Sequence, residues 1–281
     1  MNEKEKSTRS RQSGDSAPKR SYRRRTAPKD TETKEKKAVV KADKTSEVKT
    51  KSRSRQPKEI KKTPVRIIPL GGLNEIGKNM TVFECSNDMF ILDCGLAFPD
   101  ADMPGVDIVI PDFTYVERNK DKIRGIVITH GHEDHIGGLA YLLKKVNVPV
   151  YATRLTIGLI EGKLKEQGIS GKVNLNVVEP KKTVKMGCMA VEFIKVNHSI
   201  PDSVGMAIHT PAGVIVHTGD FKVDYSPIDG KIIDLARFGE LGSKGVLALL
   251  SDSTNVMRPG HSLSEREVQT SLGHIFDEAE G

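Results

Sequence analysis

The stretch Thr129-His130-Gly131-His132-Glu133-Asp134-His135 decides which fold this chain can form. It follows the short, β-branched apolar run 126–128, which is typical of a buried strand, and apolar residues recur at helical spacing from 136 to 146. The histidine cluster is therefore predicted to occupy a turn that leads from a strand into a helix.

This cluster has the composition of a metal site. His130 and His132 point to the same side if the segment is extended, because side chains alternate along a strand. Asp134 and His135 fall on the turn and the first helical positions, from which they can face the same point. Imidazole nitrogens and a carboxylate oxygen are ligands that suit zinc. A polar surface loop is the alternative, but this density of histidine and aspartate favours a metal site.

Three further polar residues, Asp93, His198 and Asp220, each follow an apolar run elsewhere in the chain. An aspartate such as Asp93 can orient a ligating histidine by accepting its second ring N–H, although an ordinary turn aspartate is the alternative. His198 could reach the first cluster or be a simple loop histidine. Asp220 has two oxygens with which to bridge two metal ions. His209 and His217 lie within predicted strands, so we interpret both as structural.

The rest of the sequence after residue 63 alternates between predicted strands and helices. Residues 80–93 predict a β-hairpin, residues 154–167 a helix, and residues 245–250 a last buried strand. Ser264 begins a capping-box pattern that opens another helix. The Gly-rich loop 71–79 matches neither nucleotide-binding pattern, so we expect it to shape the site.

Charge is distributed unevenly along the 281 residues. Residues 1–63 carry 22 Lys and Arg against 9 Asp and Glu, a net charge of +13, whereas the remaining residues carry 22 against 28, a net charge of −6. The first segment has almost no large apolar side chains, cannot bury enough surface to offset chain entropy, and is predicted to be disordered. Its basic clusters fit a contact with a nucleic acid or the ribosome, and a solubilising extension without a partner is the alternative.

The sequence contains no apolar run of about 18 residues, the length that a membrane helix needs, and no apolar signal-peptide core near its start. These features predict a soluble, intracellular protein with no membrane segment. Cys85, Cys94 and Cys188 are odd in number and lack C-x-x-C spacing. This argues against a disulfide framework and against a thiolate zinc site.

Five segments of the chain together form a recognisable pattern. They are Gly-Gly-Leu-Asn-Glu-Ile-Gly-Lys-Asn (71–79), Thr-His-Gly-His-Glu-Asp-His-Ile-Gly-Gly (129–138), Asn-His-Ser-Ile-Pro-Asp-Ser (197–203), His-Thr-Gly-Asp-Phe-Lys (217–222) and Leu-Ser-Asp-Ser-Thr-Asn (250–255). In these segments the chain closely resembles ribonuclease J, a family in the β-CASP group of metallo-β-lactamase-fold nucleases. The resemblance covers residues 64–281, and one departure is Asn74, where the family more often has glycine.

The resemblance implies an α/β fold, a four-layer αββα metallo-β-lactamase sandwich. Residues 1–63 would be a disordered Lys/Arg-rich tail, residues 64–250 an incomplete metallo-β-lactamase domain, and residues 251–281 the truncated start of a β-CASP domain. The family carries further domains after this point. We therefore expect the chain to be a fragment of a longer product.

The resemblance also implies two zinc ions and assigns their ligands. Asp93 would match the aspartate of the family's first motif, which favours the histidine-orienting role, and Asp252 would match the first β-CASP motif. The second zinc would lack one histidine that the family supplies beyond residue 281. The implied ligands are His130, His132 and His198 for the first zinc, Asp134 and His135 for the second, and Asp220 as a bridge between them.

The implied activity is zinc-dependent hydrolysis of RNA phosphodiesters, both endonucleolytic and 5′ to 3′ exonucleolytic, in rRNA processing and mRNA decay. Asp134 is the candidate to accept the proton of the attacking water. Neither the general acid nor the RNA-binding residues are identifiable. RNA would be the main partner of a cytoplasmic dimer or tetramer in the full-length form, with ribosome or degradosome components as further candidates. For the fragment alone we expect metal binding with little or no turnover.

Two other functions remain open at this point. The same zinc core could hydrolyse a small ester, thioester or lactam, but residues 251–255, which resemble the start of a β-CASP insertion, count against this. The fragment could instead be non-catalytic and bind RNA through its basic tail. Deleting the tail would separate the latter function from catalysis, since RNA binding would be lost while zinc content stayed unchanged.

Overall fold

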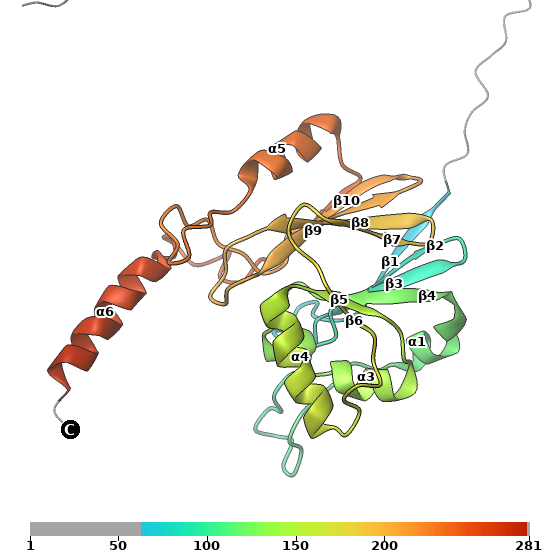
Figure 1. Cartoon of the computed structure of the whole chain (residues 1–281), viewed down its shortest axis with the longest axis horizontal. Coiled ribbons are helices and arrows are strands. Elements are labelled where there is room, and N and C mark those ends of the chain that lie inside the picture. Colours follow the sequence, from blue (N-terminus) through green and yellow to red (C-terminus); the bar gives the residue numbers. More distant parts are fainter. Residues whose placement is uncertain (1–62, 280–281) are drawn as a thin grey trace, which may run out of the picture. The chain divides into compact units, whose positions relative to one another are not determined.

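The computed structural model describes residues 63–279. The predicted disordered tail therefore lies outside the described residues, apart from its last position. Two β-sheets and the helices on their outer faces account for most of what is described (Figure 1). Within this range, each helix is too short or too polar to cross a membrane.

The first sheet has six strands in the order β1-β2-β3-β4-β5-β6. β1, β2 and β3 pair antiparallel, whereas β3 to β6 pair parallel. The predicted hairpin is confirmed as β2 and β3, which turn at Ser86 in a left-handed backbone conformation (φ 55°). The strands are β1 (Val65–Gly71), β2 (Met80–Cys85), β3 (Asp88–Leu92), β4 (Ile123–Val127), β5 (Val150–Ala152) and β6 (Leu175–Val177).

The second sheet has five strands in the order β11-β10-β9-β8-β7. β7 to β10 form an antiparallel series, and β11 joins β10 in parallel. The prediction of a buried strand over residues 245–250 is wrong in one respect, because β11 is an edge strand and Leu249 is 62 % exposed. The strands are β7 (Thr183–Met186), β8 (Met189–Lys195), β9 (Val204–Thr210), β10 (Gly213–His217) and β11 (Ala248–Leu250).

Side chains of the first sheet alternate between two separate cores. Val82 and Ile91 belong to a core shared with the helices, whereas Phe83 and Phe90 belong to a core shared with the second sheet. The rings of Phe83 and Phe90 stack with their centroids 5.0 Å apart, and Phe193 of β8 fills the same core. A sheet that is covered on both faces needs apolar residues at successive positions, which explains the uninterrupted apolar runs in these strands.

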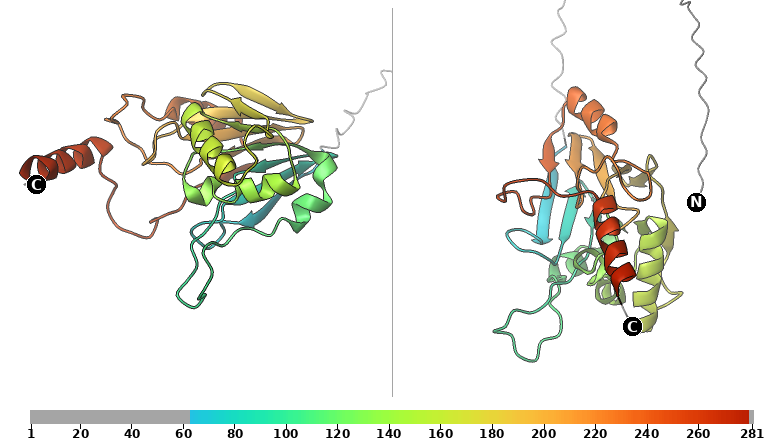
Figure 2. Two further views of the ribbon diagram at one scale, coloured as in Figure 1. Left: turned by 60° about the horizontal axis from the view of Figure 1, so that its bottom comes forward. Right: turned by 90° about the vertical axis from the view of Figure 1, so that its left-hand side faces the viewer.

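Helices cover the outer face of each sheet, so the layers follow the predicted αββα order (Figures 1 and 2). Residues of α1, α3 and α4 pack on the first sheet, and Phe238 and Leu241 of α5 pack on the second. The predicted helix over residues 154–167 is confirmed as α4. The helices are α1 (Thr114–Arg118), the 3₁₀ helix η1 (Lys120–Lys122), α2 (Glu133–Ile136), α3 (Leu139–Lys145), α4 (Arg154–Glu166), α5 (Leu235–Lys244) and α6 (Glu265–Glu278).

The helix predicted directly after the histidine cluster is interrupted. Instead of one helix over residues 136–146, the chain forms α2 and α3, which are separated at Gly137 and Gly138. A Cβ atom on Gly137 would lie 2.3 Å from the Leu96 side chain, and the Gly138 N–H donates to the Cys94 carbonyl (2.9 Å). This close approach of the strand end after β3 overrides the local helical spacing, and it brings Asp93 next to α2.

Glu84 on β2 is a nearly buried carboxylate, with 7 % of its side chain exposed. It accepts hydrogen bonds from Lys122 Nζ (3.0 Å) and from the Tyr115 hydroxyl (2.9 Å), and Arg66 lies 3.3 Å away. Burial alone would raise the pKa of the Glu84 carboxyl, but these hydrogen bonds and charges outweigh it and lower the pKa. We expect Glu84→Gln to lower the free energy of unfolding at pH 7 by about 1.5–3 kcal/mol, the usual range for hydrogen bonds to a charged group.

This stability difference should depend on pH. Because the pKa of Glu84 is depressed in the folded state, the contribution is fully present above the unfolded-state pKa of about 4.3 and is lost as pH falls through the lower folded-state pKa. Denaturant unfolding of both proteins at pH 7 and in acid would measure it. Glu117→Gln, which removes an exposed partner of Lys145, is the control, with an expected change of about 1 kcal/mol or less. Equal stability of wild type and Glu84→Gln at pH 7 would contradict this account.

Candidate metal centre

The predicted site residues lie at the ends of strands from both sheets. Asp93 follows β3 and the segment 130–135 follows β4 in the first sheet. His198 follows β8 and Asp220 follows β10 in the second sheet. The structure brings all of these residues together, although they are far apart in the sequence.

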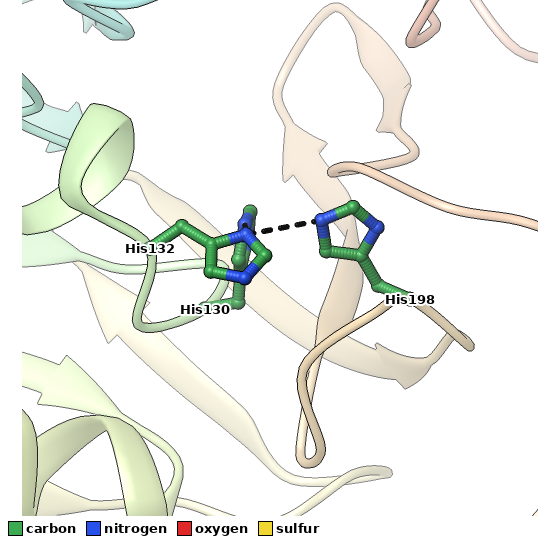
Figure 3. Close-up of side chains that lie close together, drawn as sticks. All are labelled: His130, His132 and His198. Atoms are coloured by element: carbon green, nitrogen blue, oxygen red, sulfur yellow. Dashed lines mark hydrogen bonds between the residues drawn. The ribbon is translucent and has the colours of Figure 1, made fainter. Parts of the chain in front are cut away.

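His130, His132 and His198 form a first group of ring nitrogens (Figure 3). The Nδ1 atom of His132 lies 3.1 Å from Nε2 of His130 and 3.2 Å from Nε2 of His198. One nitrogen of each ring lies within 4.8 Å of the other two. His130 is fully buried and the other two are half-buried, so the group faces solvent on the side of His132 and His198.

His135, Asp134 and Asp220 lie around a second point, which His130 also borders. The Nε2 atom of His135 lies 3.5 Å from Oδ2 of Asp134 and 3.4 Å from Oδ1 of Asp220. The other oxygen of Asp220 lies 3.7 Å from Nε2 of His198. Asp220 therefore faces histidines of both groups, which is the position that a carboxylate bridging two ions requires.

Asp93 contacts the side of His135 that faces away from Asp220. Its carboxylate accepts hydrogen bonds from the backbone N–H (2.8 Å) and hydroxyl (2.9 Å) of Thr129, and it lies 2.9 Å from Nδ1 of His135. This arrangement turns Nε2 of His135 toward the second group, where the Asn79 side-chain amide lies 3.2 Å from it. Asp93 is buried and has a left-handed backbone conformation (φ 59°), a strained geometry that is common at functional sites.

Two residues of the site, Thr129 and Asn79, had no role predicted from the sequence. The hydroxyl of Thr129 lies 3.0 Å from Nδ1 of His130 and 3.2 Å from Nδ1 of His135. The Asn79 amide donates to the backbone carbonyl (3.1 Å) and the carboxylate (3.3 Å) of Asp134. Both residues belong to the segments that resemble ribonuclease J. Threonine and asparagine are common in ordinary loops, however, so only the contacts of these two side chains reveal a role.

His217, interpreted from the sequence as structural, borders the second group. Its Nδ1 atom accepts a hydrogen bond from the Gly219 N–H (3.0 Å), which places the ring proton on Nε2. Burial lowers the pKa of His217, so the ring is a neutral support for the turn that carries Asp220. His209 lies elsewhere, with Nε2 2.9 Å from Glu192.

The electrostatics of the site favour a bound cation. Burial, with the neighbouring His135 ring, lowers the pKa of His130 to about 2, and burial also lowers the pKa of His198, so both rings are neutral nitrogen donors. Burial alone would lower the pKa of His135, but the nearby aspartates, above all Asp93, outweigh it and raise the pKa well above its usual value. Burial alone would raise the pKa of Asp220, but the adjacent histidines lower it. The aspartates therefore concentrate negative charge around His135, and this charge attracts a cation, either a proton on the ring or a metal ion.

A cavity of about 330 Å³ opens beside the second group. The Gly-rich loop 71–77 forms one wall, and residues 250–254, including Asp252, form another. The Asp252 carboxylate accepts a hydrogen bond from the Phe221 N–H (3.4 Å), and the Asp252 N–H donates to the Thr218 hydroxyl (3.0 Å). Asp252 thus lies against the segment that carries Asp220, with space beside it for part of a substrate.

The donor atoms fit zinc. Three imidazole nitrogens form the first group, and an imidazole with two carboxylates forms most of the second. Zinc accepts His and Asp ligands, whereas calcium and magnesium prefer sites built from oxygen atoms. The roles of the individual ligands, of Asp134 as proton acceptor and of Asp252 stay predictions.

Replacing Asp93 with asparagine is expected to weaken zinc binding roughly 10–100-fold, the usual cost of losing a hydrogen-bond partner behind a ligand. The amide would present an N–H to the ring nitrogen of His135 and lose the negative charge. Competition against a chromophoric chelator would measure the affinity. Asp112→Asn is a matched control, because Asp112 is an exposed aspartate that accepts a hydrogen bond from Thr114 N–H (2.8 Å). If Asp93→Asn bound zinc with the affinity of wild type, Asp93 would have no role in orienting the metal ligands.

Comparison with known proteins finds related sequences and a related fold. The family described as "Metallo-beta-lactamase superfamily" matches residues 74–261. The chain is 52 % identical to ribonuclease J of Synechocystis sp. over 77 % of its own length and 34 % of that protein. It is 49 % identical to ribonuclease J of Thermus thermophilus, covering 77 % of this chain and 39 % of that one. It is 47 % identical to ribonuclease J2 of Bacillus subtilis, and the match covers 76 % of this chain and 38 % of that protein.

The chain thus spans between about a third and two fifths of the length of these curated relatives. Among solved structures, a protein of unknown function from Enterococcus faecalis superposes with a TM-score of 0.56 at 16 % identity, covering 74 % of this chain and 56 % of that one. At this identity the likeness concerns the fold alone. It supports the two-sheet architecture independently of the sequence matches.

Proposed function

Because the chain belongs to the metallo-β-lactamase superfamily and is homologous to the N-terminal portion of ribonuclease J, we propose that it forms the metal-binding part of a zinc-dependent ribonuclease. The observation that carries the proposal is the arrangement of two adjoining ligand groups. They share His130, and Asp220 faces histidines of both groups at 3.4 and 3.7 Å. Two metal positions of this kind suit the hydrolysis of a phosphodiester.

The chemistry follows from the residues around the two groups. A zinc pair held by the three histidines, His135 and the aspartates would supply a nucleophilic water at neutral pH and offset negative charge on the phosphoryl oxygens. Asp134 is the candidate to hold the proton of that water, since its carboxylate is half-exposed and lies beside His135. Asn79 fixes that carboxylate through its hydrogen bond to Oδ2. The cavity beside Asp252 would receive the RNA backbone.

The wider assignment rests on the relatives named ribonuclease J. The proposed activity is endonucleolytic and 5′ to 3′ exonucleolytic cleavage of RNA in the cytoplasm, during rRNA processing and mRNA decay. Residues 64–250 would form the metallo-β-lactamase domain, and residues 251–281 the start of a β-CASP domain. Homodimers or homotetramers, and contacts with the ribosome or degradosome, belong to the same proposal.

The first test measures zinc per chain by mass spectrometry together with cleavage of a 5′-monophosphorylated RNA. Metal content is measured on the 281-residue chain, and cleavage on the protein at its natural length. We expect up to two zinc ions per chain, and cleavage that disappears in His132→Ala. RNA cleavage that survives His132→Ala, or wild-type protein that binds no zinc, would overturn the proposal. Cleavage of a small ester, thioester or lactam without cleavage of RNA would assign the zinc core to another substrate.

A further inference from the structure

Asn197 is a buried polar residue that has no place in the ligand set. It lies between the end of β8 and His198, and it is 5 % exposed. A buried carboxamide is costly unless its polar atoms have partners, so its hydrogen bonds show what it holds.

Asn197 joins three segments of the chain. Its backbone carbonyl accepts a hydrogen bond from the Lys222 N–H (2.8 Å). Its side-chain amide donates to the Lys231 carbonyl (2.8 Å), and its side-chain oxygen accepts from the Ile233 N–H (2.8 Å). All three are short, well-formed hydrogen bonds.

Two of these segments carry candidate ligands. His198 follows Asn197 directly, and Lys222 is two residues after Asp220. The bridge between Asn197 and Lys222 therefore sets how closely the loop of His198 approaches the loop of Asp220, whose side chains lie 3.7 Å apart.

The third segment anchors this bridge to the fold. Ile233 is buried, and the next residue, Asp234, donates its N–H to the Lys195 carbonyl at the end of β8 (3.0 Å). Asp234 also caps α5, since its carboxylate accepts from the Arg237 N–H (3.0 Å). The Asn197 carboxamide is thus held against a segment that is tied both to the second sheet and to the helix that covers it.

We propose that Asn197 is a positioning residue that fixes the separation of His198 and Asp220, and thereby the geometry of both metal positions. This inference rests on the proposed zinc site. Only a carboxamide of this length supplies both the donor to Lys231 and the acceptor for Ile233. Aspartate keeps the acceptor but places a negative charge against a carbonyl oxygen, and alanine removes the donor to the Lys231 carbonyl and leaves the buried Ile233 N–H without this partner.

The test compares Asn197→Asp and Asn197→Ala with wild type in zinc affinity and in the visible spectrum of the cobalt-substituted protein. We expect zinc affinity to fall roughly 10–100-fold, as for other residues that orient metal ligands, and the cobalt bands to change in position and intensity. Asn176→Ala is the matched control. Its amide also donates to backbone carbonyls, of Val150 (3.2 Å) and Asn174 (3.3 Å), but on β6. This control should keep the wild-type affinity and spectrum.

The outcomes separate this inference from the proposed function. Wild-type protein without zinc overturns the proposed function itself. Wild-type protein that binds zinc, with variants that match it in affinity and spectrum, overturns the role of Asn197 alone. If neither variant folds, NMR of the wild type decides. The Asn197 side-chain amide protons should exchange slowly with water and shift on zinc binding, and fast exchange in the zinc-loaded protein would overturn the inference.

Discussion

Exchange of Asp220 for asparagine is expected to leave fewer than two zinc ions per chain and to reduce RNA cleavage on the order of 10³-fold or more. Asp220 faces His135 with one oxygen and His198 with the other, so it contributes negative charge to both positions. Asparagine offers a single oxygen and no charge. Loss of metal removes several kcal/mol of transition-state stabilisation, and each 1.4 kcal/mol corresponds to a tenfold change in rate.

Single-turnover cleavage of a 5′-monophosphorylated RNA, measured with the protein at its natural length, would test this expectation. Metal content is determined on the same samples. Asp112→Asn again serves as the control, because it neutralises an exposed aspartate that accepts a hydrogen bond from the Thr114 N–H. Cleavage by Asp220→Asn within tenfold of wild type would show that the carboxylate does not serve both metal positions.

Removal of zinc is expected to lower the free energy of unfolding by about 4 kcal/mol, relative to protein in free zinc at about 1000 times the dissociation constant. The ligands come from three strand ends in two sheets, so they are assembled only in the folded chain. A ligand that binds the folded state alone stabilises it by mass action. Urea unfolding with zinc and with a chelator would give the difference.

Two variants make this measurement specific. Glu84→Gln should be less stable than wild type with or without zinc, yet gain the same increment from the metal, because Glu84 belongs to a structural cluster with Lys122 and Tyr115. Asp220→Asn should lose most of the increment. An equal zinc increment in wild type and Asp220→Asn would place the stabilising metal elsewhere.

Local features of the sequence were sufficient for much of the secondary structure. The hairpin of β2 and β3, helix α4 and the start of α6 at Ser264 were all predicted correctly. The Ser264 hydroxyl accepts from the Arg266 N–H, so it caps the helix. These elements depend on side-chain periodicity, turn residues and caps, which act over a few neighbouring positions.

The failures of prediction have a common cause. The break between α2 and α3 arises because Gly137 lies against Leu96, and β11 is partly exposed because it occupies a sheet edge. Neither fact is present in the residues of the element itself, since both depend on what packs beside it. Periodicity shows that a segment is apolar but not which neighbours cover it.

For the candidate site, too, some features could be predicted from the sequence and others depend on the tertiary structure. The sequence by itself determined which residues could bind a metal, because histidines and aspartates at successive strand ends have few other uses in such a pattern. It also identified the family through segments 71–79, 129–138, 197–203, 217–222 and 250–255. Only the tertiary structure decided that Asp93 contacts His135, that Thr129 and Asn79 support the ligands, and that Asn197 joins the loops of His198 and Asp220. Aspartate, threonine and asparagine are common in ordinary loops, and their roles here come from hydrogen bonds between residues that only folding brings together.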